Sequence, residues 1–313
     1  MLRRLRGEAR SDLGRAAVGT ADVLLGKKHI ALEYPPRRNE PRWGYGRAML
    51  GGLAEHVEAS QAVIARTLDM LGSYREELER IERQAADPAE PSWLNGFLPA
   101  LDGAAIYGFL RDRRPARYLE IGSGNSTKFA ARAKRDGNLA TEIVSIDPQP
   151  RAEIDALCDR VIRTELQDTD QGLFADLGPG DIVFFDGSHA VYMNSDVAAF
   201  MLEILPRIPP GVLVGVHDIY LPDDYPPEVA DRYYNEQYVL AAFLLGAGDR
   251  VKTVLPAMYA SRRMRAPSEL EALFAHPNLA GVDEHGCAFW FDSPRTGEAW
   301  AAPRAAVLHG EHE

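Results

Sequence analysis

The sequence predicts an α/β protein built on one doubly wound, mostly parallel sheet. From residue 95 onward, short apolar runs alternate with helical segments, which is typical of βαβ units. Three of these runs end in clusters of Gly, Asp or His, at the position where open α/β sheets bind ligands. The three segments are residues 118–127, 181–189 and 211–218. Seven strands with helices on both faces is the most economical assembly of the whole pattern.

The chain before residue 95 has a different pattern. Up to Trp43 it is rich in Pro and Gly, and we expect an irregular arm after a short helix over residues 12–25. Over residues 49–84, apolar residues recur at intervals of three, four or seven, which predicts one long helix. Its apolar stripe either packs on its own domain or makes a homodimer. We therefore divide the chain into residues 1–94, an arm and long helix, and residues 95–313, an α/β domain.

Within residues 95–313, turn and helix signals separate the strands. Asp102 is the expected N-cap of a helix that stops before Pro115, and a later helix is predicted over residues 268–275. Strands are expected at residues 118–122, 142–147, 161–165, 182–186, 212–217, 251–259 and 288–291.

Composition excludes several function classes. The chain has 313 residues, a formal net charge of −11, 46% hydrophobic residues and 26% charged residues, as in an ordinary globular protein. The negative charge argues against partners such as nucleic acid or anionic membrane, which need clustered Lys and Arg. The two cysteines match no disulfide or metal-site spacing, and no apolar run approaches the ~20 residues that span a bilayer. We expect a cytoplasmic protein with a small-molecule partner.

A glycine loop follows the strand at residues 118–122. Gly122 and Gly124 permit close backbone approach, and the helix that begins near Asn125 offers its N–H groups to a polar ligand. Asp147 ends the next strand, where a carboxylate can accept both hydroxyls of a ribose. Ser126 or Thr127 stands where dinucleotide enzymes have a third glycine. The loop therefore favours a single nucleoside over a pyrophosphate.

At these residues the chain resembles a known family. The run Glu120-Ile-Gly-Ser-Gly-Asn-Ser-Thr127, the acid in Ser145-Ile-Asp147-Pro, and the strand ends at Asp186 and at His217-Asp218 are similar to class I S-adenosylmethionine-dependent methyltransferases. Among them, the closest resemblance is to bacterial small-molecule methyltransferases found with polysaccharide or secondary-metabolite genes. The resemblance covers about residues 95–291. It implies a Rossmann-like sheet of order 3-2-1-4-5-7-6 with the last strand antiparallel.

The resemblance also implies a cofactor site. S-adenosylmethionine is expected to lie against the glycine loop, with its ribose on Asp147. The residues expected at the cofactor are Glu120, Gly122, Ser123, Gly124, Asn125, Ser126, Asp147 and Asp186.

A second cluster predicts the chemistry. In the metal-dependent O-methyltransferases that the chain resembles, the same strand ends hold a divalent ion, which here would be bound by Asp186, His217 and Asp218. His217 departs from that pattern, because imidazole suits Zn, Fe, Ni or Mn better than Mg. In a competing interpretation, Asp186 binds the ammonium group of the cofactor, and His217 and Asp218 only shape the acceptor pocket. His189 lies where similar enzymes carry a base, and it can accept the proton of an acceptor hydroxyl.

The segment at residues 219–227 is a candidate lid. It is stiffened by Pro and rich in Tyr, and its tyrosines either contact a polyol substrate or simply cover the domain. We expect Asp223 and Asp224 to be solvated. The leading hypothesis is therefore methylation of a small hydroxylated metabolite, such as a sugar. There are two alternatives. One is a non-haem-iron hydroxylase with a two-histidine, one-carboxylate site, and the other is a non-catalytic cofactor-binding dimer.

Overall fold

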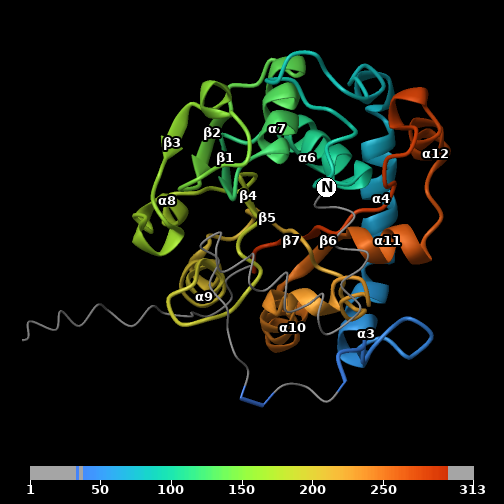
Figure 1. Cartoon of the computed structure of the whole chain (residues 1–313), viewed down its shortest axis with the longest axis vertical. Helices are drawn as coiled ribbons and strands as arrows, with labels where there is room; N and C mark the ends of the chain where they lie inside the picture. Colours follow the sequence, from blue (N-terminus) through green and yellow to red (C-terminus); the bar gives the residue numbers. More distant parts are fainter. Residues whose placement is uncertain (1–32, 35–37, 295–313) are drawn as a thin grey trace, which may run out of the picture. The chain divides into compact units, whose positions relative to one another are not determined.

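The computed structural model describes residues 33–34 and 38–294 (Figure 1). Within them, one compact unit begins at Glu40, and the account below concerns that unit. The helix predicted over residues 12–25 lies outside the described residues, as does the Arg-rich start of the chain.

The compact unit is built on one seven-stranded sheet of order β3-β2-β1-β4-β5-β7-β6, as the resemblance implied. The first five strands of that order pair in parallel, and β7 runs antiparallel between β5 and β6. The strands are β1 (Arg117–Ile121), β2 (Glu142–Ile146), β3 (Arg160–Ile162), β4 (Ile182–Phe185), β5 (Leu213–Val216), β6 (Lys252–Pro256) and β7 (Phe289–Asp292). Each predicted strand is present, within a few residues of its predicted ends.

The register of the sheet brings the four central strand ends to the same level. Ile121 pairs with Ile146 on one side and with Phe185 on the other, and Phe185 pairs with Val216. Backbone hydrogen bonds continue one residue beyond these pairs, for example from Asp186 N to the Ile121 carbonyl at 2.9 Å. The residues that follow the strands therefore share one edge of the sheet. They are Gly122, Asp147, Asp186 and His217.

Helices cover both faces of the sheet. In Figure 1, α6 and α7 lie on one side of the row of strands, and α9 and α10 lie on the other. The bounds are α6 (Ala100–Arg113), α7 (Asn125–Asp136), α8 (Gly172–Ala175), α9 (Asp196–Ala199), α10 (Glu236–Ala247), α11 (Ala257–Arg263) and α12 (Ser268–Phe274). The strand predicted over residues 251–259 is shorter than expected, because Pro256 ends β6 and α11 begins at the next residue.

The long helix predicted over residues 49–84 is divided in the structure. It forms α3 (Gly51–Ala59), α4 (Gln61–Gly72) and α5 (Arg75–Leu78), with breaks at Ser60 and at residues 73–74. Helix α4 packs against β6, α6 and α12. Its apolar stripe is buried in the same core as the sheet, so the stripe packs within its own chain. The compact unit begins at Glu40. The division of the chain after residue 94 stays a prediction. A homodimer stays a prediction.

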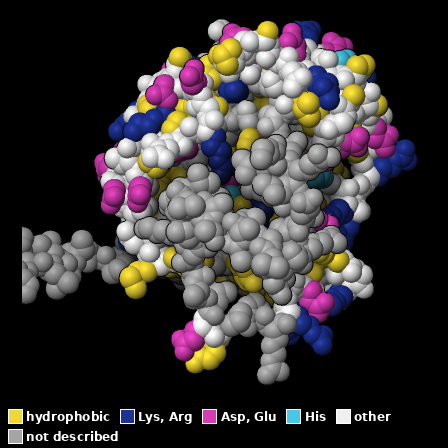
Figure 2. All heavy atoms as spheres, viewed as in Figure 1, with side chains coloured by type: hydrophobic (Ala, Val, Ile, Leu, Met, Phe, Trp, Pro, Cys, Tyr) yellow, Lys and Arg dark blue, Asp and Glu magenta, His cyan; other side chains and the backbone are white. Residues whose placement is uncertain are grey.

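The surface carries both signs of charge. On the face shown in Figure 2, Lys and Arg side chains alternate with Asp and Glu around the visible rim of the described residues. None of the helices in the described part of the chain combines the length and apolar composition needed to cross a membrane.

Candidate functional site

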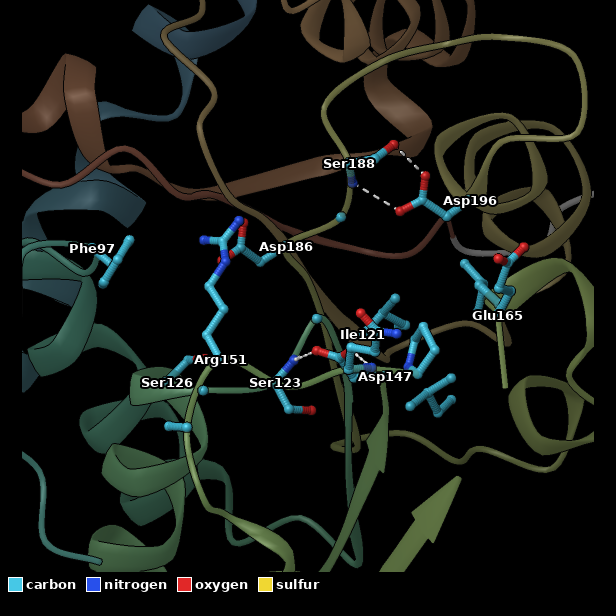
Figure 3. A pocket seen from close by; sticks show the side chains of 18 of the residues that line it. Phe97, Ile121, Ser123, Ser126, Asp147, Arg151, Glu165, Asp186, Ser188 and Asp196 are labelled. Carbon is cyan, nitrogen blue, oxygen red and sulfur yellow. Dashed lines mark hydrogen bonds between the residues drawn. The ribbon is translucent and has the colours of Figure 1, made fainter. Parts of the chain in front are cut away.

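A cavity of about 650 Å³ opens at the edge of the sheet where the parallel strands end (Figure 3). Its walls come from the loops after β1, β2 and β4 and from the start of α7. Seven of the eight residues predicted at the cofactor line it: Gly122, Ser123, Gly124, Asn125, Ser126, Asp147 and Asp186. The exception is Glu120.

Gly122 brings the β1 loop against the end of β4. Its φ of +79° lies in the left-handed region, and a Cβ atom at this position would lie 1.8 Å from the carbonyl oxygen of Asp186. Only glycine fits such a conformation and such a close approach. Gly124 is different, because its φ of 174° is extended and a Cβ there meets no atom within 4 Å. Gly122 is therefore needed by the fold, whereas Gly124 leaves room in the cavity.

Asp147 is fixed by two backbone hydrogen bonds. Its Oδ2 accepts from Ser123 N at 2.8 Å, and its Oδ1 accepts from Gln149 N at 2.8 Å. The Ser123 hydroxyl also lies 2.7 Å from the hydroxyl of Ser145 on β2. These bonds join the β1 loop to the β2 loop. Each carboxylate oxygen keeps a lone pair, so the group can still accept hydroxyls from a ligand in the cavity.

Glu120 lies beneath the glycine loop and, unlike the other seven residues predicted at the cofactor, does not line the cavity. Its Oε1 accepts from the Tyr118 hydroxyl at 3.1 Å, and its Oε2 accepts from the Thr127 hydroxyl. Thr127 in turn accepts from Gly124 N at 3.0 Å. Burial raises the pKa of Glu120 to about 7, against the opposing effect of its hydrogen bonds. Glu120 thus supports the loop from below.

The cavity also contains residues that the sequence pattern did not indicate. Arg151 extends from the β2 loop, and its guanidinium points toward Asp186 in Figure 3. The same guanidinium lies over the Phe97 ring, 5.4 Å from its centre. Phe97 is 63% exposed at the mouth of the cavity. An aromatic ring and a cation at the mouth suit a flat, polar ligand such as a nucleoside.

Beside the cavity, four side chains from the ends of β4 and β5 converge. His189 Nε2 lies 3.7 Å from Asp186 Oδ1 and 3.6 Å from Asp218 Oδ2. His217 Nδ1 lies 3.5 Å from Asp186 Oδ1 and 3.8 Å from Asp218 Oδ1. One nitrogen of each imidazole therefore faces both carboxylates. We call Asp186, His189, His217 and Asp218 the His/Asp cluster.

Two residues of the cluster have an unusual backbone conformation. His189 has a φ of +64° and Asp218 a φ of +54°, in the left-handed region that non-glycine residues seldom adopt. Such strained residues concentrate at functional sites. The loop after β4 is held in place by Asn235, whose N donates to the His189 carbonyl at 3.0 Å and whose side chain accepts from Val191 N.

A buried carboxylate orients each histidine of the cluster. His189 Nδ1 lies 2.7 Å from Glu236 Oε1, at the start of α10, and His217 Nε2 lies 3.3 Å from Asp102 Oδ2, in α6. Both carboxylates are fully buried. Asp102 does not cap its helix as predicted, because α6 begins at Ala100 and Pro99 occupies the N-cap position. No local pattern of residues indicates either pairing.

The same charges set the protonation of the cluster. Burial opposes ionisation of Asp186, but the neighbouring His217 and His189 outweigh it and lower the pKa of the carboxyl. Burial also lowers the pKa of His189, yet the hydrogen bond and charge of Glu236 raise it above the usual value overall. The carboxylates of the cluster therefore favour a positive charge on the neighbouring imidazoles.

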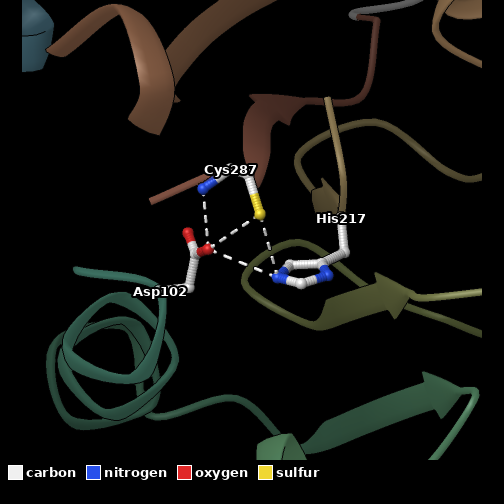
Figure 4. Close-up of side chains that lie close together, drawn as sticks. All are labelled: Asp102, His217 and Cys287. Carbon is white, nitrogen blue, oxygen red and sulfur yellow. Dashed lines mark hydrogen bonds and ion pairs between the residues drawn. The ribbon is translucent and has the colours of Figure 1, made fainter. Parts of the chain in front are cut away.

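Asp102, His217 and Cys287 form a second close group (Figure 4), whose ligand-type atoms lie within 4.8 Å of one another. Asp102 is already engaged, because its two oxygens accept from the backbone N of Cys287 at 2.7 Å and of Ala288 at 3.0 Å. Burial raises the pKa of the Cys287 thiol well above its usual value, so the thiol stays protonated. This group anchors the chain before β7 and holds His217.

The candidate lid at residues 219–227 is mostly buried. Tyr220 and Tyr225 are 9% and 6% exposed, so these tyrosines cover the domain. Asp223 and Asp224, expected to be solvated, are 2% and 5% exposed. Asp223 accepts two hydrogen bonds from Arg263, and Asp224 accepts one from the Tyr238 hydroxyl at 2.6 Å. Partners distant in the sequence therefore keep both acids in the interior.

Comparisons with known proteins agree with this geometry. A family model described as a methyltransferase domain matches residues 119–219. This match covers the glycine loop and the His/Asp cluster. A comparison of the sequence with curated proteins gave no significant match.

Solved structures similar to the chain include methyltransferases. PaMTH1 from Podospora anserina, bound to S-adenosylhomocysteine (SAH), is 16% identical, with a TM-score of 0.38, over 85% of this chain and 100% of that one. An O-methyltransferase from Bacillus cereus in complex with SAH is 16% identical, with a TM-score of 0.37, over 77% and 97% of the two chains. MycE of the mycinamycin pathway, with Mg, SAH and mycinamycin VI, is 24% identical, with a TM-score of 0.29, over 43% and 40%.

Residues 119–219 are thus similar to a methyltransferase domain, and they lie in a sheet of the order that the resemblance to class I S-adenosylmethionine-dependent methyltransferases implied.

Proposed function

We propose that this methyltransferase transfers a methyl group from S-adenosylmethionine to a hydroxyl oxygen of a small polar metabolite, with a sugar as one candidate. The observation that supports it is the position of Asp186. This residue lines the cofactor cavity and also belongs to the His/Asp cluster. The reactive end of a methyl donor bound in the cavity would therefore lie next to groups that can hold and deprotonate a hydroxyl.

The cofactor side of the proposal uses the glycine loop and the β2 loop. Asp147 would accept the ribose hydroxyls, since it faces the cavity and its orientation is fixed by Ser123 and Gln149. Extended backbone at Gly124 leaves space for the amino-acid part of the ligand. The cavity volume of about 650 Å³ suits a nucleoside-sized molecule.

The acceptor side includes a divalent cation held by Asp186, His217 and Asp218. His217 Nδ1 is buried and has no hydrogen-bond partner among the described residues, and it faces two carboxylates. A neutral imidazole whose lone pair faces two anions is unfavourable unless a proton or a metal cation lies between them. The residues therefore fit a cation. S-adenosylmethionine supplies an electrophilic methyl group, and a divalent cation supplies a Lewis acid that favours the ionised form of a hydroxyl.

Substrate alignment is the main task of the protein in such a transfer. Displacement at a methyl carbon needs the acceptor oxygen in line with the departing sulfur, so rigid walls accelerate it. The loop after β4 is rigid in this respect, because Asn235 and Glu236 both hold it. His189 turns Nε2 toward Asp186 and Asp218, because its Nδ1 is engaged with Glu236.

The experiment that tests the function is calorimetry with S-adenosylmethionine and with SAH, followed by transfer of a radiolabelled methyl group to a panel of hydroxylated metabolites. Binding of both compounds is expected, with Asp147→Ala weakening it by about tenfold or more, since a charged acceptor is lost. Asp231→Ala, outside the cavity, is the matched control and should bind like the parent. Absence of binding at millimolar cofactor would refute the proposal.

A further inference from the structure

We propose that the His/Asp cluster is a two-histidine, two-carboxylate site for a transition metal such as Mn²⁺, Fe²⁺ or Zn²⁺, and that His189 is one of its ligands. Asp102 and Glu236 are then positioning residues that orient the two ligand histidines. This assignment rests on the proposed function only in placing the reaction beside Asp186. Metal binding itself is measurable without a methyl donor or an acceptor.

The first reason is the direction of the two imidazoles. His189 presents Nε2 and His217 presents Nδ1, and each of these atoms faces both Asp186 and Asp218 at 3.5 to 3.8 Å. Ligand atoms around a first-row metal lie about 3 to 3.4 Å apart when the metal–ligand bonds are about 2.1 Å. Each of the four contacts is less than about 1 Å longer than this, but among the described residues only Asp102, His217 and Cys287 bring three ligand atoms within 4.8 Å of one another. The four groups of the His/Asp cluster therefore need to move inward to hold a metal.

The second reason is the state of the other nitrogen of each ring. Glu236 lies 2.7 Å from Nδ1 of His189, and Asp102 lies 3.3 Å from Nε2 of His217. A carboxylate that accepts the N–H of one ring nitrogen leaves the lone pair of the other free for a metal. Histidine ligands in metalloproteins are usually held in this way. Glu236 provides this arrangement for His189, whereas Nε2 of His217 lies 3.3 Å from Asp102 and 3.4 Å from the Cys287 thiol.

The third reason is burial. Asp102 and Glu236 are fully buried, and His189 and His217 are 5% and 3% exposed. Keeping several ionisable groups together in the interior is costly unless opposite charge compensates them. A metal ion compensates Asp186 and Asp218 directly.

Ligand chemistry decides which metal fits. Mg²⁺ prefers oxygen ligands and nearly ideal octahedral geometry, whereas Mn²⁺, Fe²⁺ and Zn²⁺ accept imidazole. A ligated Nε2 cannot also accept a proton. The role of His189 as a ligand therefore replaces the role of base that the sequence predicted.

The group of Asp102, His217 and Cys287 is the competing location. It would use Nε2 of His217 in place of Nδ1, and it would need an ionised Cys287. Both oxygens of Asp102 are engaged by backbone N–H groups, and the thiol donates to the Asp218 carboxylate at 3.3 Å. These contacts favour the His/Asp cluster.

The test uses the full chain, freed of metal with a chelator and titrated with MnCl₂, ZnCl₂ or MgCl₂ in a calorimeter. One equivalent of Mn²⁺ or Zn²⁺ is expected to bind at least about tenfold more tightly than Mg²⁺. Electron spin-echo spectroscopy of the Mn²⁺ form should detect two directly bound ¹⁴N nuclei in the parent and one in His189→Ala. His285→Ala, a half-buried histidine outside the cluster, should keep both.

Further variants separate the roles. Glu236→Ala is expected to weaken Mn²⁺ binding by about 10- to 100-fold, while Glu236→Gln keeps most of it, because the amide oxygen still accepts from Nδ1. Cys287→Ala should bind Mn²⁺ like the parent, and loss of binding there would move the site to the competing group. Two bound nitrogens in His189→Ala would overturn the ligand role and restore the base. Binding of no transition metal by the parent would overturn the proposal, whereas failure of methyl transfer with intact metal binding would refute only the proposed function.

Discussion

The carbonyl oxygen of Asp186 lies 1.8 Å from the position that a Cβ atom would take on Gly122. This close approach joins the two halves of the site. Gly122 begins the loop that lines the cofactor cavity, and Asp186 belongs to both the cavity and the His/Asp cluster. A shift of the loop after β1 must therefore also move the loop after β4.

Gly122→Ala is expected to damage both stability and cofactor binding. The variant meets a backbone oxygen and also adopts a φ of +79°, which costs an L-residue about 1–2 kcal/mol before any clash. We expect a total loss of about 3 kcal/mol or more in the free energy of unfolding. Urea denaturation measures the stability, and calorimetry with SAH measures the binding.

Gly124→Ala is the matched control for that variant. Its added Cβ meets nothing within 4 Å and its φ is extended, so the free energy of unfolding should change by less than about 1 kcal/mol. Equal stability of the two variants would mean that the contact between Gly122 and Asp186 does not constrain the fold.

Glu120→Gln is expected to make the protein less sensitive to rising pH. The pKa of Glu120 is about 7 in the folded protein and 4.5 in the unfolded chain, so the folded state binds this proton more tightly. Its contribution to stability is complete below about pH 4.5 and is lost as the pH rises through 7. The difference of about 2.5 pKa units corresponds to about 3 kcal/mol.

The measurement compares the variant with the parent at pH 5 and at pH 8. Gln cannot ionise, and its amide can still bond to Tyr118 and Thr127. The free energy of unfolding of the variant, relative to that of the parent, should therefore rise by about 2–3 kcal/mol from pH 5 to pH 8. Glu76→Gln, an exposed change on α5, should show no such gain. A constant difference between Glu120→Gln and parent across this range would contradict the assignment.

Much of the fold was predictable because its signals are local. Apolar runs bounded by Gly and Asp define β1, β4 and β5, and parallel strands of similar length bring their ends to one edge. The proximity of Asp186 and Asp218 follows from that rule alone. The break of the long N-terminal helix at Ser60 was not predictable, because the apolar spacing continues across it.

The supporting residues of the site were not predictable, for a physical reason. Asp102 meets Cys287 across 185 residues, and His189 meets Glu236 across 47. Such pairings depend on where α6 and α10 pack against the sheet, and no local pattern encodes that. The burial of Glu120 was not predictable for a related reason, since alternation along β1 does not tell which face lies under the loop. Asp102, Glu236 and Glu120 are all charged residues that are fully buried, and this burial is the signal that would have identified them.

Asp223→Ala is expected to destabilise the protein by about 2 kcal/mol, since the partly exposed Arg263 loses two charge-assisted hydrogen bonds. The Asp223 side chain is 3% exposed, and its Oδ1 and Oδ2 accept from the two terminal nitrogens of Arg263 at 2.8 and 2.9 Å. Thermal and urea unfolding measure the loss. Glu271→Ala is the control, because Glu271 pairs with a largely exposed Arg265 at 3.5 Å and should cost less than about 0.5 kcal/mol. A loss at Asp223 no greater than at Glu271 would mean that the segment after β5 is held by its apolar contacts alone.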